Sequence, residues 1–285
     1  MKEFGKIDLS NKVIVITGGA GELCGRFSEA LAECGAKVAI IDLRKEAAEG
    51  LAHKIIKKGG TAIGIEANVL ELKSLLKAEI VLKKEFGLCN ILINGAGGNH
   101  PKGTTSNEFM TLEDLDSEKK NIITFFDLDQ KGIEFVFNLN FLGTLLPTQV
   151  FAKHMINQKS GVIINISSMN AFTPLTKIPA YSGAKAAVSN FTQWLAVYFS
   201  KVGIRVNAIA PGFFLTEQNR SLLTNKDGSL TNRGNKILNM TPMGRFGNPE
   251  ELIGTLLWLI DETASSFVNG VIIPVDGGFS AYSGV

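Results

Sequence analysis

The sequence predicts an α/β fold in which a parallel sheet carries helices on both faces. Short apolar runs of strand length alternate with longer segments of helical pattern along most of the 285 residues. The runs are apolar at nearly every position, which is typical of strands buried on both faces, and strand–helix alternation favours parallel neighbours. The length allows one large domain or two small ones. Because no linker, repeat or low-complexity segment divides the chain, we expect a single domain over 1–285.

Most of the predicted strands are short aliphatic runs, whereas 61–67 and 205–209 also contain polar or charged residues, and a helical segment follows nearly every strand. In chain order the strands are 13–17, 38–41, 61–67, 91–93, 162–166, 205–209 and 271–275. The helices between them are 22–34, 44–58, 71–86, about 129–157 and about 180–202. A last helix is predicted to begin at Asn248, where an N-cap residue precedes a proline and two acids, Glu250 and Glu251.

Two stretches break this alternation, residues 98–128 and residues 213–247. Loops longer than about 12–15 residues are usually lids, binding loops or disordered segments. Both stretches lie where a substrate-specificity element could be, and we expect an inserted loop at about 98–128, which is a candidate lid, and a substrate loop at about 213–247.

Composition excludes several classes of function. The net charge is only +2, from 29 basic and 27 acidic residues, so no nucleic-acid partner is expected. The three cysteines form no Cys-x-x-Cys pair and the three histidines are scattered, so we expect neither disulfides nor a metal site. The N-terminus lacks the apolar core of a signal peptide, and no run of about 18 apolar residues follows. We therefore expect a cytoplasmic protein without a membrane partner.

Polar residues and glycines follow six consecutive predicted strands. In a parallel sheet, ligands bind beyond the carboxyl ends of the strands. The six segments that follow the strands, in order, are Thr17 to Gly25, Asp42, Asn68, Asn94 to Gly97, Ser167-Ser168 and Pro211-Gly212. A single glycine loop is weak evidence, but six such strand ends together indicate a binding site along this edge.

The first two strand ends predict a dinucleotide site. The loop Gly18-Gly19-Ala20-Gly21 brings N–H groups and a helix N-terminus close enough to hold a pyrophosphate, although it is also consistent with a tight turn alone. Asp42 lies 24 residues beyond Gly18 and can accept hydrogen bonds from a ribose 2′-hydroxyl while repelling a 2′-phosphate. We therefore expect NAD(H) rather than NADP(H), with Arg44 able to soften that preference.

Tyr181 and Lys185 lie at i and i+4 on one face of a predicted helix. Tyr-x-x-x-Lys occurs often by chance. Here it follows Ser168 by 13 residues, inside a nucleotide-binding pattern, and that context favours a catalytic pair.

Together these residues resemble the short-chain dehydrogenase/reductase family over essentially the whole chain. The shared pieces also include Asn140, Thr216 and the closing Asp276-Gly277-Gly278. The resemblance implies a Rossmann-type doubly wound sheet of seven parallel strands, a nicotinamide cofactor and a homotetramer. It implies a catalytic tetrad of Asn140, Ser168, Tyr181 and Lys185. The residues implied in cofactor binding are Gly18, Gly19, Gly21, Leu23, Asp42, Asn68, Val69, Asn94, Ala96, Gly97, Tyr181, Lys185, Pro211, Gly212 and Thr216.

The chain departs from the family pattern at several positions. The family loop Thr-Gly-x-x-x-Gly-x-Gly would place glycines at 22 and 24, where this chain has Glu22 and Cys24, so Glu22 must point away from a pyrophosphate. The usual second asparagine of Asn-Asn-Ala-Gly is Gly95, and the usual aspartate after the third strand is Asn68, whose amide can still bond an adenine.

These departures resemble one subgroup of the family, sugar-acid oxidoreductases that interconvert D-mannonate and D-fructuronate. The shared stretches are the loop ending Leu23-Cys24, Gly97-Gly98-Asn99-His100-Pro101 and the last nine residues.

The resemblance implies that Tyr181 is the general acid/base, that Ser168 bonds the substrate oxygen and that Asn140 positions a water near Lys185. We expect Lys185 and an oxidised nicotinamide to lower the tyrosine pKa by about 2–3 units from its ordinary value near 10. A substrate carboxylate needs cations or N–H donors. The candidates are Asn99, His100, Asn170 and Arg220 in the run Gln218-Asn219-Arg220, with a local hydrogen bond as the alternative for His100 and an exposed charge for Arg220.

Three functions remain open. The first is the NAD(H)-dependent sugar-acid oxidoreductase. The second is another substrate on the same machinery, as in a gluconate 5-dehydrogenase or a 3-oxoacyl carrier reductase. The third is a non-catalytic nucleotide-sensing regulator, which the complete tetrad disfavours.

Overall fold

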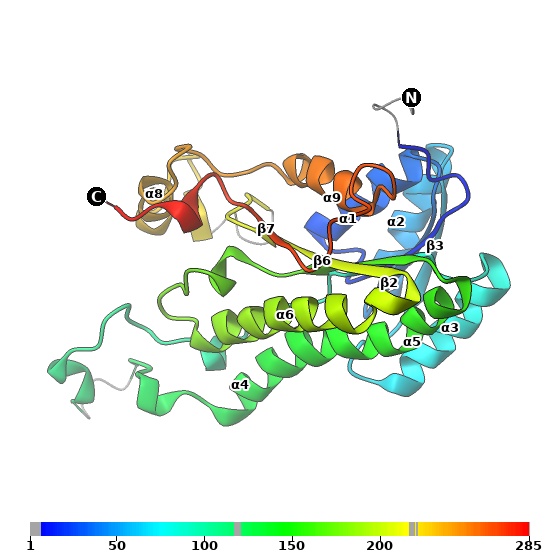
Figure 1. Ribbon diagram of the computed structural model, residues 1–285. Coiled ribbons are helices and arrows are strands. Elements are labelled where there is room, and N and C mark those ends of the chain that lie inside the picture. Colours follow the sequence, from blue (N-terminus) through cyan, green and yellow to red (C-terminus); the bar gives the residue numbers. More distant parts are fainter. Residues whose placement is uncertain (1–6, 117–120, 217–219, 221, 285) are drawn as a thin grey trace.

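The structure, a computed structural model, confirms the predicted seven-stranded parallel sheet (Figure 1). It describes residues 7–116, 121–216, 220 and 222–284. The strand order is β3-β2-β1-β4-β5-β6-β7, and every pair is parallel. The strands are β1 Val13–Thr17, β2 Lys37–Asp42, β3 Thr61–Glu66, β4 Ile91–Asn94, β5 Gly161–Ile166, β6 Ile204–Pro211 and β7 Ile272–Val275.

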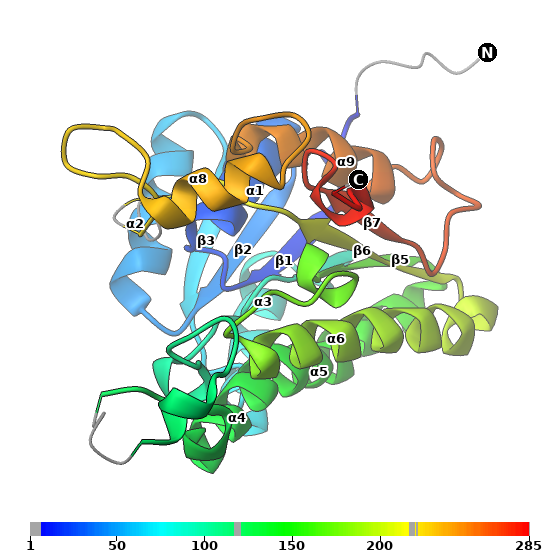
Figure 2. The ribbon, with the colours of Figure 1, turned by 90° about the vertical axis from the view of Figure 1, so that its left-hand side faces the viewer.

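Helices cover both faces of the sheet, as Figures 1 and 2 show. The helices are α1 Glu22–Glu33, α2 Lys45–Lys57, α3 Leu72–Glu85, α4 Gln130–Phe137, α5 Gly143–Gln158, α6 Pro179–Tyr198, α8 Asn232–Asn239 and α9 Ile253–Ile260. One apolar cluster joins α1, α2 and α9 to one face, with Phe27 and Leu256 buried in it. A second cluster joins α3, α5 and α6 to the other face, where Phe151 and Met155 are buried.

The four neighbouring strands β2, β1, β4 and β5 are buried at nearly every position, as their apolar sequences predict. Because both faces of a central parallel strand meet helices, no position along it is free for a polar side chain except at its ends. Polar groups that these strands contribute to a site are therefore expected at the strand ends and in the residues directly beyond them.

The long helix predicted near 129–157 is interrupted by a π-helical turn, Asn138–Leu142, between α4 and α5. Such turns place one extra residue in the helix and occur often at functional sites. The combined helix, Gln130–Gln158, is long and apolar enough to cross a membrane, which corrects the expectation that no such stretch exists. Half of its most apolar window is buried inside the protein, and its α5 part packs on β4 and β5, as a core helix does.

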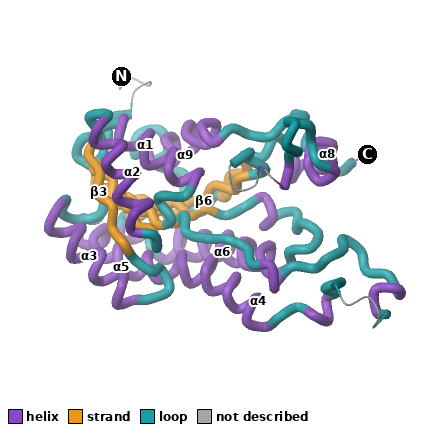
Figure 3. The backbone as a smooth tube through the Cα atoms, turned by 180° about the vertical axis from the view of Figure 1, so that it is seen from behind, coloured by secondary structure: helices purple, strands orange, loops and turns teal. Residues whose placement is uncertain are grey.

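The two interruptions of the pattern lie on one side of the sheet. The 98–128 insertion projects from the edge where the strands end, and its described part contains only short 3-10 turns (Figures 1 and 3). The described part of the 213–247 stretch lies beyond the same edge and contains α8, where the sequence pattern predicts a loop. Four of the eight residues in α8 are asparagine or glycine, poor helix formers, which hid it from the pattern.

Candidate active site

The sheet register brings the predicted strand ends to one level. Thr17 pairs with Asn94, and Asn94 pairs with Asn165 near the end of β5. The Asn94 amide donates to Asn165 Oδ1 over 2.8 Å and to Thr148 Oγ1 over 3.0 Å, so a buried polar row lies beneath the edge. The strand order reverses between β1 and β4, which is where an open α/β sheet forms its ligand crevice.

The glycine loop after β1 is pressed against the chain that leaves β4. Gly18 adopts a φ of +60°, and a Cβ there would lie 2.9 Å from the backbone of Ala96. Only glycine suits both conditions. Gly21 is the N-cap of α1 and offers no side-chain cap, so the first N–H groups of that helix remain available to an anion. Glu22 is exposed, in keeping with the need to point away, and Leu23 packs against the core.

Asp42, the last residue of β2, is only 8% exposed. Its carboxylate accepts a hydrogen bond from the Ala20 N–H over 3.2 Å and another from the Arg44 N–H over 3.1 Å. The Arg44 guanidinium lies 3.3 Å from the same carboxylate and is largely exposed. Asp42 is thus held beside the glycine loop, and Arg44 partly offsets its charge.

After β3, the Asn68 side chain builds the turn into α3. Its Oδ1 accepts from the Leu70 N–H over 3.0 Å, and its Nδ2 donates to Glu71 over 2.9 Å. Only one donor bond of this amide, the one to Glu71, is formed with the described residues. Val69 is buried and packs against Gly143, at the start of α5.

Asn140 lies in the π-helical turn and is fully buried. Its Nδ2 donates to the carbonyls of Gly98 and Val136 over 2.7 and 2.8 Å, and its Oδ1 accepts from the Gly98 N–H over 3.2 Å. The side chain is therefore held on the segment that leaves β4. A Cβ at Gly97 would lie 2.6 Å from Asn140 Oδ1 and 3.1 Å from Lys185 Nζ, which places both groups around that glycine.

Ser168 follows β5, and Tyr181 and Lys185 lie in the first turns of α6. A hydrogen bond joins the Tyr181 hydroxyl to Ser168, and the Lys185 ammonium lies 5.7 Å from the centre of the Tyr181 ring. Lys185 Nζ is buried and donates to the Ile166 carbonyl over 2.8 Å. The structure therefore brings all four predicted tetrad residues to one end of the sheet.

The expectation that Lys185 lowers the pKa of Tyr181 is wrong. Burial raises the pKa of Tyr181 to about 12, and the bond with Ser168 opposes that rise without overcoming it. Lys185 is not among the groups that lower this pKa. Its own pKa is lowered to about 8, because a buried ammonium loses its hydration.

Gly212 follows β6 and faces the start of the last turn. A Cβ at Gly212 would lie 2.5 Å from Asp276 Cα, so only glycine allows this approach. Pro211 ends β6 in register with Val275 of β7, and Thr216 lies further along the substrate loop. The sixth strand end thus joins the same edge as the other five.

The substrate candidates separate in the structure. Asn170 is buried, two residues beyond Ser168, and its Oδ1 has no hydrogen-bond partner among the described residues. His100 Nδ1 accepts a hydrogen bond from the Lys102 N–H over 3.1 Å, and its ring contacts Phe135. This local hydrogen bond is the alternative to a substrate contact that the sequence leaves open. Asn99 is exposed and donates to Thr104. Arg220 is exposed, whereas Gln218 and Asn219 lie outside the described residues.

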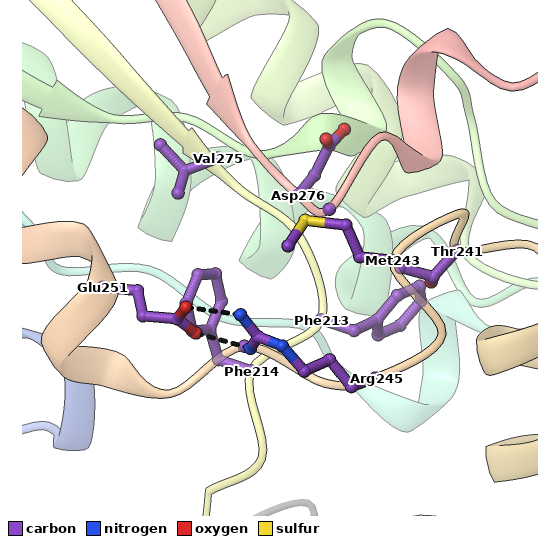
Figure 4. A pocket seen from close by; sticks show the side chains of 10 residues that line it. Phe213, Phe214, Thr241, Met243, Arg245, Glu251, Val275 and Asp276 are labelled. Carbon is purple, nitrogen blue, oxygen red and sulfur yellow. Dashed lines mark hydrogen bonds and ion pairs between the residues drawn. The ribbon is translucent and has the colours of Figure 1, made fainter.

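A small pocket of about 90 Å³ lies next to the ends of β6 and β7 (Figure 4). Its wall includes Phe213, Phe214 and Arg245, and none of the four tetrad residues lines it. Arg245 holds Glu251 in a two-pronged ion pair at 2.6 and 2.8 Å, which lowers the pKa of Glu251 to about 2. Glu251 in turn caps the turn before α9 at Asn248. These contacts give Arg245 a structural role.

One contact between the insertion and the substrate loop is not predicted by the sequence pattern. Glu108 of the insertion forms a close ion pair with Lys236 of α8, and the charges of Lys177 and Arg233 also act on that carboxylate. The insertion is further tied to the loop before Tyr181, because the Thr105 N–H donates to the Lys177 carbonyl over 2.9 Å. These charges are scattered singly along the sequence, so no local pattern marks them.

Comparisons with known proteins agree with this geometry. A family model described as short chain dehydrogenase matches residues 12–227. An uncharacterized oxidoreductase of Haemophilus influenzae is 62% identical over 278 residues, which cover 98% of this chain and 96% of the relative. An uncharacterized oxidoreductase of Bacillus subtilis, UxuB, is 51% identical over 98% of both chains.

A crystal structure of a Haemophilus influenzae protein, provisionally described as a D-mannonate oxidoreductase and holding NAD, superposes with a TM-score of 0.93. It is 62% identical to this chain, and the match covers 98% of each protein. The fold, the site and these relatives lead to one conclusion: the chain is an oxidoreductase that belongs to the short-chain dehydrogenase family.

Proposed function

We propose that this oxidoreductase uses NAD(H) to interconvert a sugar-acid ketone and its secondary alcohol, and that the pair is D-fructuronate and D-mannonate. The observation that carries the cofactor preference is the buried Asp42 carboxylate beside the glycine loop. Support for the substrate comes from the provisional description of the Haemophilus influenzae structure, which also holds NAD.

The residues at the sheet edge fit the cofactor. Gly18 and Gly212 leave room where any side chain would meet backbone, and the uncapped N-terminus of α1 suits a pyrophosphate. We assign Gly18, Gly19 and Gly21 to the phosphates and Asp42 to the ribose hydroxyls. Its carboxylate accepts hydrogen bonds from two N–H groups, which hold it beside the glycine loop, and a carboxylate there would repel a 2′-phosphate.

When bound, NADH supplies the hydride for the ketone carbon. The hydroxyl of Tyr181 supplies the proton to the ketone oxygen, and the hydroxyl of Ser168 bonds that oxygen as it gains negative charge. Lys185 lies one turn from Tyr181, and Asn140 holds Gly98, in the segment that follows β4, by a hydrogen bond. Because the pKa of Lys185 is about 8, this group can take up and release protons near neutral pH.

We propose that the substrate's polar groups contact Asn170 and residues of the two loops. Asn170 Oδ1 is buried and has no hydrogen-bond partner among the described residues. Because an unsatisfied buried acceptor is destabilising, we propose that a hydroxyl of the substrate donates to it. The cations Lys177, Arg233 and Lys236 supply positive charge near the same loops. His100 and Arg220 remain proposed contacts for the carboxylate.

One panel of substrates tests the proposal. Purified protein is offered fructuronate, 5-ketogluconate and an acyl ketone with NADH or NADPH, and nucleotide oxidation is followed by absorbance. We expect fructuronate with NADH to give the highest kcat/KM. A higher value with 5-ketogluconate would assign the chain to the gluconate 5-dehydrogenase type, and preference for NADPH would refute the role of Asp42. Absence of turnover with every ketone would favour the nucleotide-sensing alternative.

Asn170→Ala tests the placement of the substrate. We expect a rise of roughly tenfold or more in the KM for fructuronate, as loss of a buried hydrogen bond implies, with the KM for NADH unchanged. An unchanged KM for fructuronate would remove Asn170 from the site.

We also propose that the whole chain acts as one cytoplasmic catalytic domain and assembles as a homotetramer. Exposed aromatic side chains gather on α6, where Trp194 stacks on Tyr198 with ring centres 4.7 Å apart. An exposed apolar face of this kind favours contact with another protein surface. The mass of the protein in solution, measured by light scattering, tests this assembly.

A further inference from the structure

The structure explains two of the departures from the family pattern together. Gly95 is the first residue after β4, and Cys24 lies in the first turn of α1. A Cβ built at Gly95 would overlap the sulfur of Cys24, and on another side it would lie 2.9 Å from the Thr17 carbonyl oxygen. The cysteine sulfur thus occupies the space that a side chain at position 95 would need.

Cys24 fills this space as an uncharged group. It is 5% exposed, and burial raises the pKa of its thiol to about 12, so the thiol is neutral at pH 7. A buried neutral thiol packs like a small apolar side chain. The close-packed interior around it leaves little freedom for an added atom.

The segment that begins at Gly95 joins the cofactor loop to the catalytic residues. We call residues 95–98 the β4 exit. At its start, the N–H groups of Gly95 and Ala96 donate to Thr17 Oγ1 over 3.2 and 3.3 Å. At its end, Gly98 exchanges two hydrogen bonds with Asn140. A shift of the β4 exit therefore moves both the glycine loop and the surroundings of Asn140.

Lys185 is reached by the same segment. A Cβ at Gly97 would lie 3.1 Å from Lys185 Nζ, so this amine lies close beside the β4 exit, on the side that a side chain at position 97 would occupy. The β4 exit has little room to move, because Gly18 of the glycine loop packs closely against the backbone of Ala96.

We propose that Cys24 and Gly95 are a size-matched pair that positions the β4 exit, and through it sets the glycine loop relative to Asn140 and Lys185. Both are positioning residues, since they act on the cofactor site and the tetrad through the segment between them. The inference rests on the proposed NAD(H) site but not on the identity of the substrate.

A double-mutant cycle tests the pair. In Gly95→Ala the new methyl meets the Cys24 sulfur, and we expect the Kd for NADH, measured by fluorescence, to rise at least tenfold. In the double variant with Cys24→Ala, the nearest atom on that side is the residue-24 Cβ at 3.6 Å, an ordinary contact. We therefore expect the double variant to bind NADH at least threefold more tightly than Gly95→Ala. Recovery stays incomplete because the Thr17 carbonyl still crowds the methyl.

Two further measurements separate positioning from a general loss of folding. The pH dependence of kcat should shift in Gly95→Ala and return toward wild type in the double variant, because Asn140 and Lys185 move with the β4 exit. Gly50→Ala is the matched control: Gly50 lies in α2 with nothing near its would-be Cβ, and its NADH Kd and pH profile should not change.

The outcomes decide the proposal in each case. Equal or weaker NADH binding in the double variant than in Gly95→Ala, or wild-type binding in Gly95→Ala, overturns it. If Gly95→Ala does not fold, the double variant should recover a cooperative melt, and failure of the double when Cys24→Ala alone folds also overturns it. A wild-type protein that binds NADH but does not reduce fructuronate refutes the substrate and leaves the pair intact, whereas no NADH binding at all refutes the cofactor.

Discussion

The edge of the sheet and the two loops above it are built in opposite ways. At the edge, the residues that we propose for catalysis are buried and held by hydrogen bonds, three for the Asn140 side chain and one for the Lys185 ammonium. In the loops, large apolar side chains such as Leu112, Phe109 and Phe126 are more than two thirds exposed, and an exposed ion pair joins one loop to the other. The difference is consistent with our proposal that the edge carries the reaction chemistry and that the loops select the substrate.

Removing the phenol should give the largest effect and would locate the chemistry at the edge. Tyr181→Phe removes the proton donor, and general acid/base groups contribute roughly 10²–10⁴ to the rate. We expect kcat to fall by about that factor while NADH binding by fluorescence stays near wild type. Tyr198→Phe, on the exposed face of the same helix, is the control and should keep full kcat. Retention of more than a tenth of kcat in Tyr181→Phe would move the chemistry elsewhere.

A smaller effect is expected at the cofactor end of the edge. Asp42→Asn removes a charged acceptor beside the glycine loop, and hydrogen bonds to charged groups are worth about 1.5–3 kcal/mol. We expect kcat/KM for NADH to fall roughly 10–100-fold and the value for NADPH to rise. Glu66→Gln, whose residue pairs with Asp42 in the sheet but is exposed, should leave both values unchanged. An unaltered preference in Asp42→Asn would show that another group selects the nucleotide.

Stability should show what the buried ammonium costs. The pKa of Lys185 in the folded protein, about 8, lies below its ordinary value of 10.5. The unfolded chain thus binds more protons between these values, and wild-type stability should rise relative to Lys185→Met as pH goes from 7 to 9.5, by about 1–2 kcal/mol. Urea denaturation at both pH values measures this difference. The exposed Lys201→Met should show no such trend, and a gap that is the same at both pH values would contradict the burial of a charged Lys185.

The smallest effect is expected in the loops. Glu108→Gln removes a negative charge that faces Lys236, so an anionic substrate should bind more readily and its KM should fall, roughly two- to fivefold at low salt. The change should vanish in 0.5 M salt, because exposed charges are screened. Lys12→Met breaks an ion pair before β1, at the opposite edge, and should leave KM unchanged. A rise in KM for Glu108→Gln would mean that the ion pair with Lys236 favours substrate binding.

The sequence by itself determined the sheet, the order of its helices and the set of strand-end residues that the structure brings together. Fully apolar strands such as β1 and β5 can be buried only between two layers of helices, so their pattern leaves few alternatives. The position of the strand ends then follows from parallel pairing, which is why Thr17, Asn94 and Asn165 fall into register.

Only the tertiary structure decided the features that depend on neighbours distant in sequence. Burial, which raises the pKa of Tyr181 and lowers that of Lys185, is a property of the packed site and not of the Tyr-x-x-x-Lys spacing. The match of Cys24 to Gly95, and the contact of Glu108 with Lys236, each join residues 71 or more positions apart. The residues of α8 have low intrinsic helix propensity. The helix forms because Gly234 and Ile237 are buried against other parts of the protein, and this packing outweighs the low propensity.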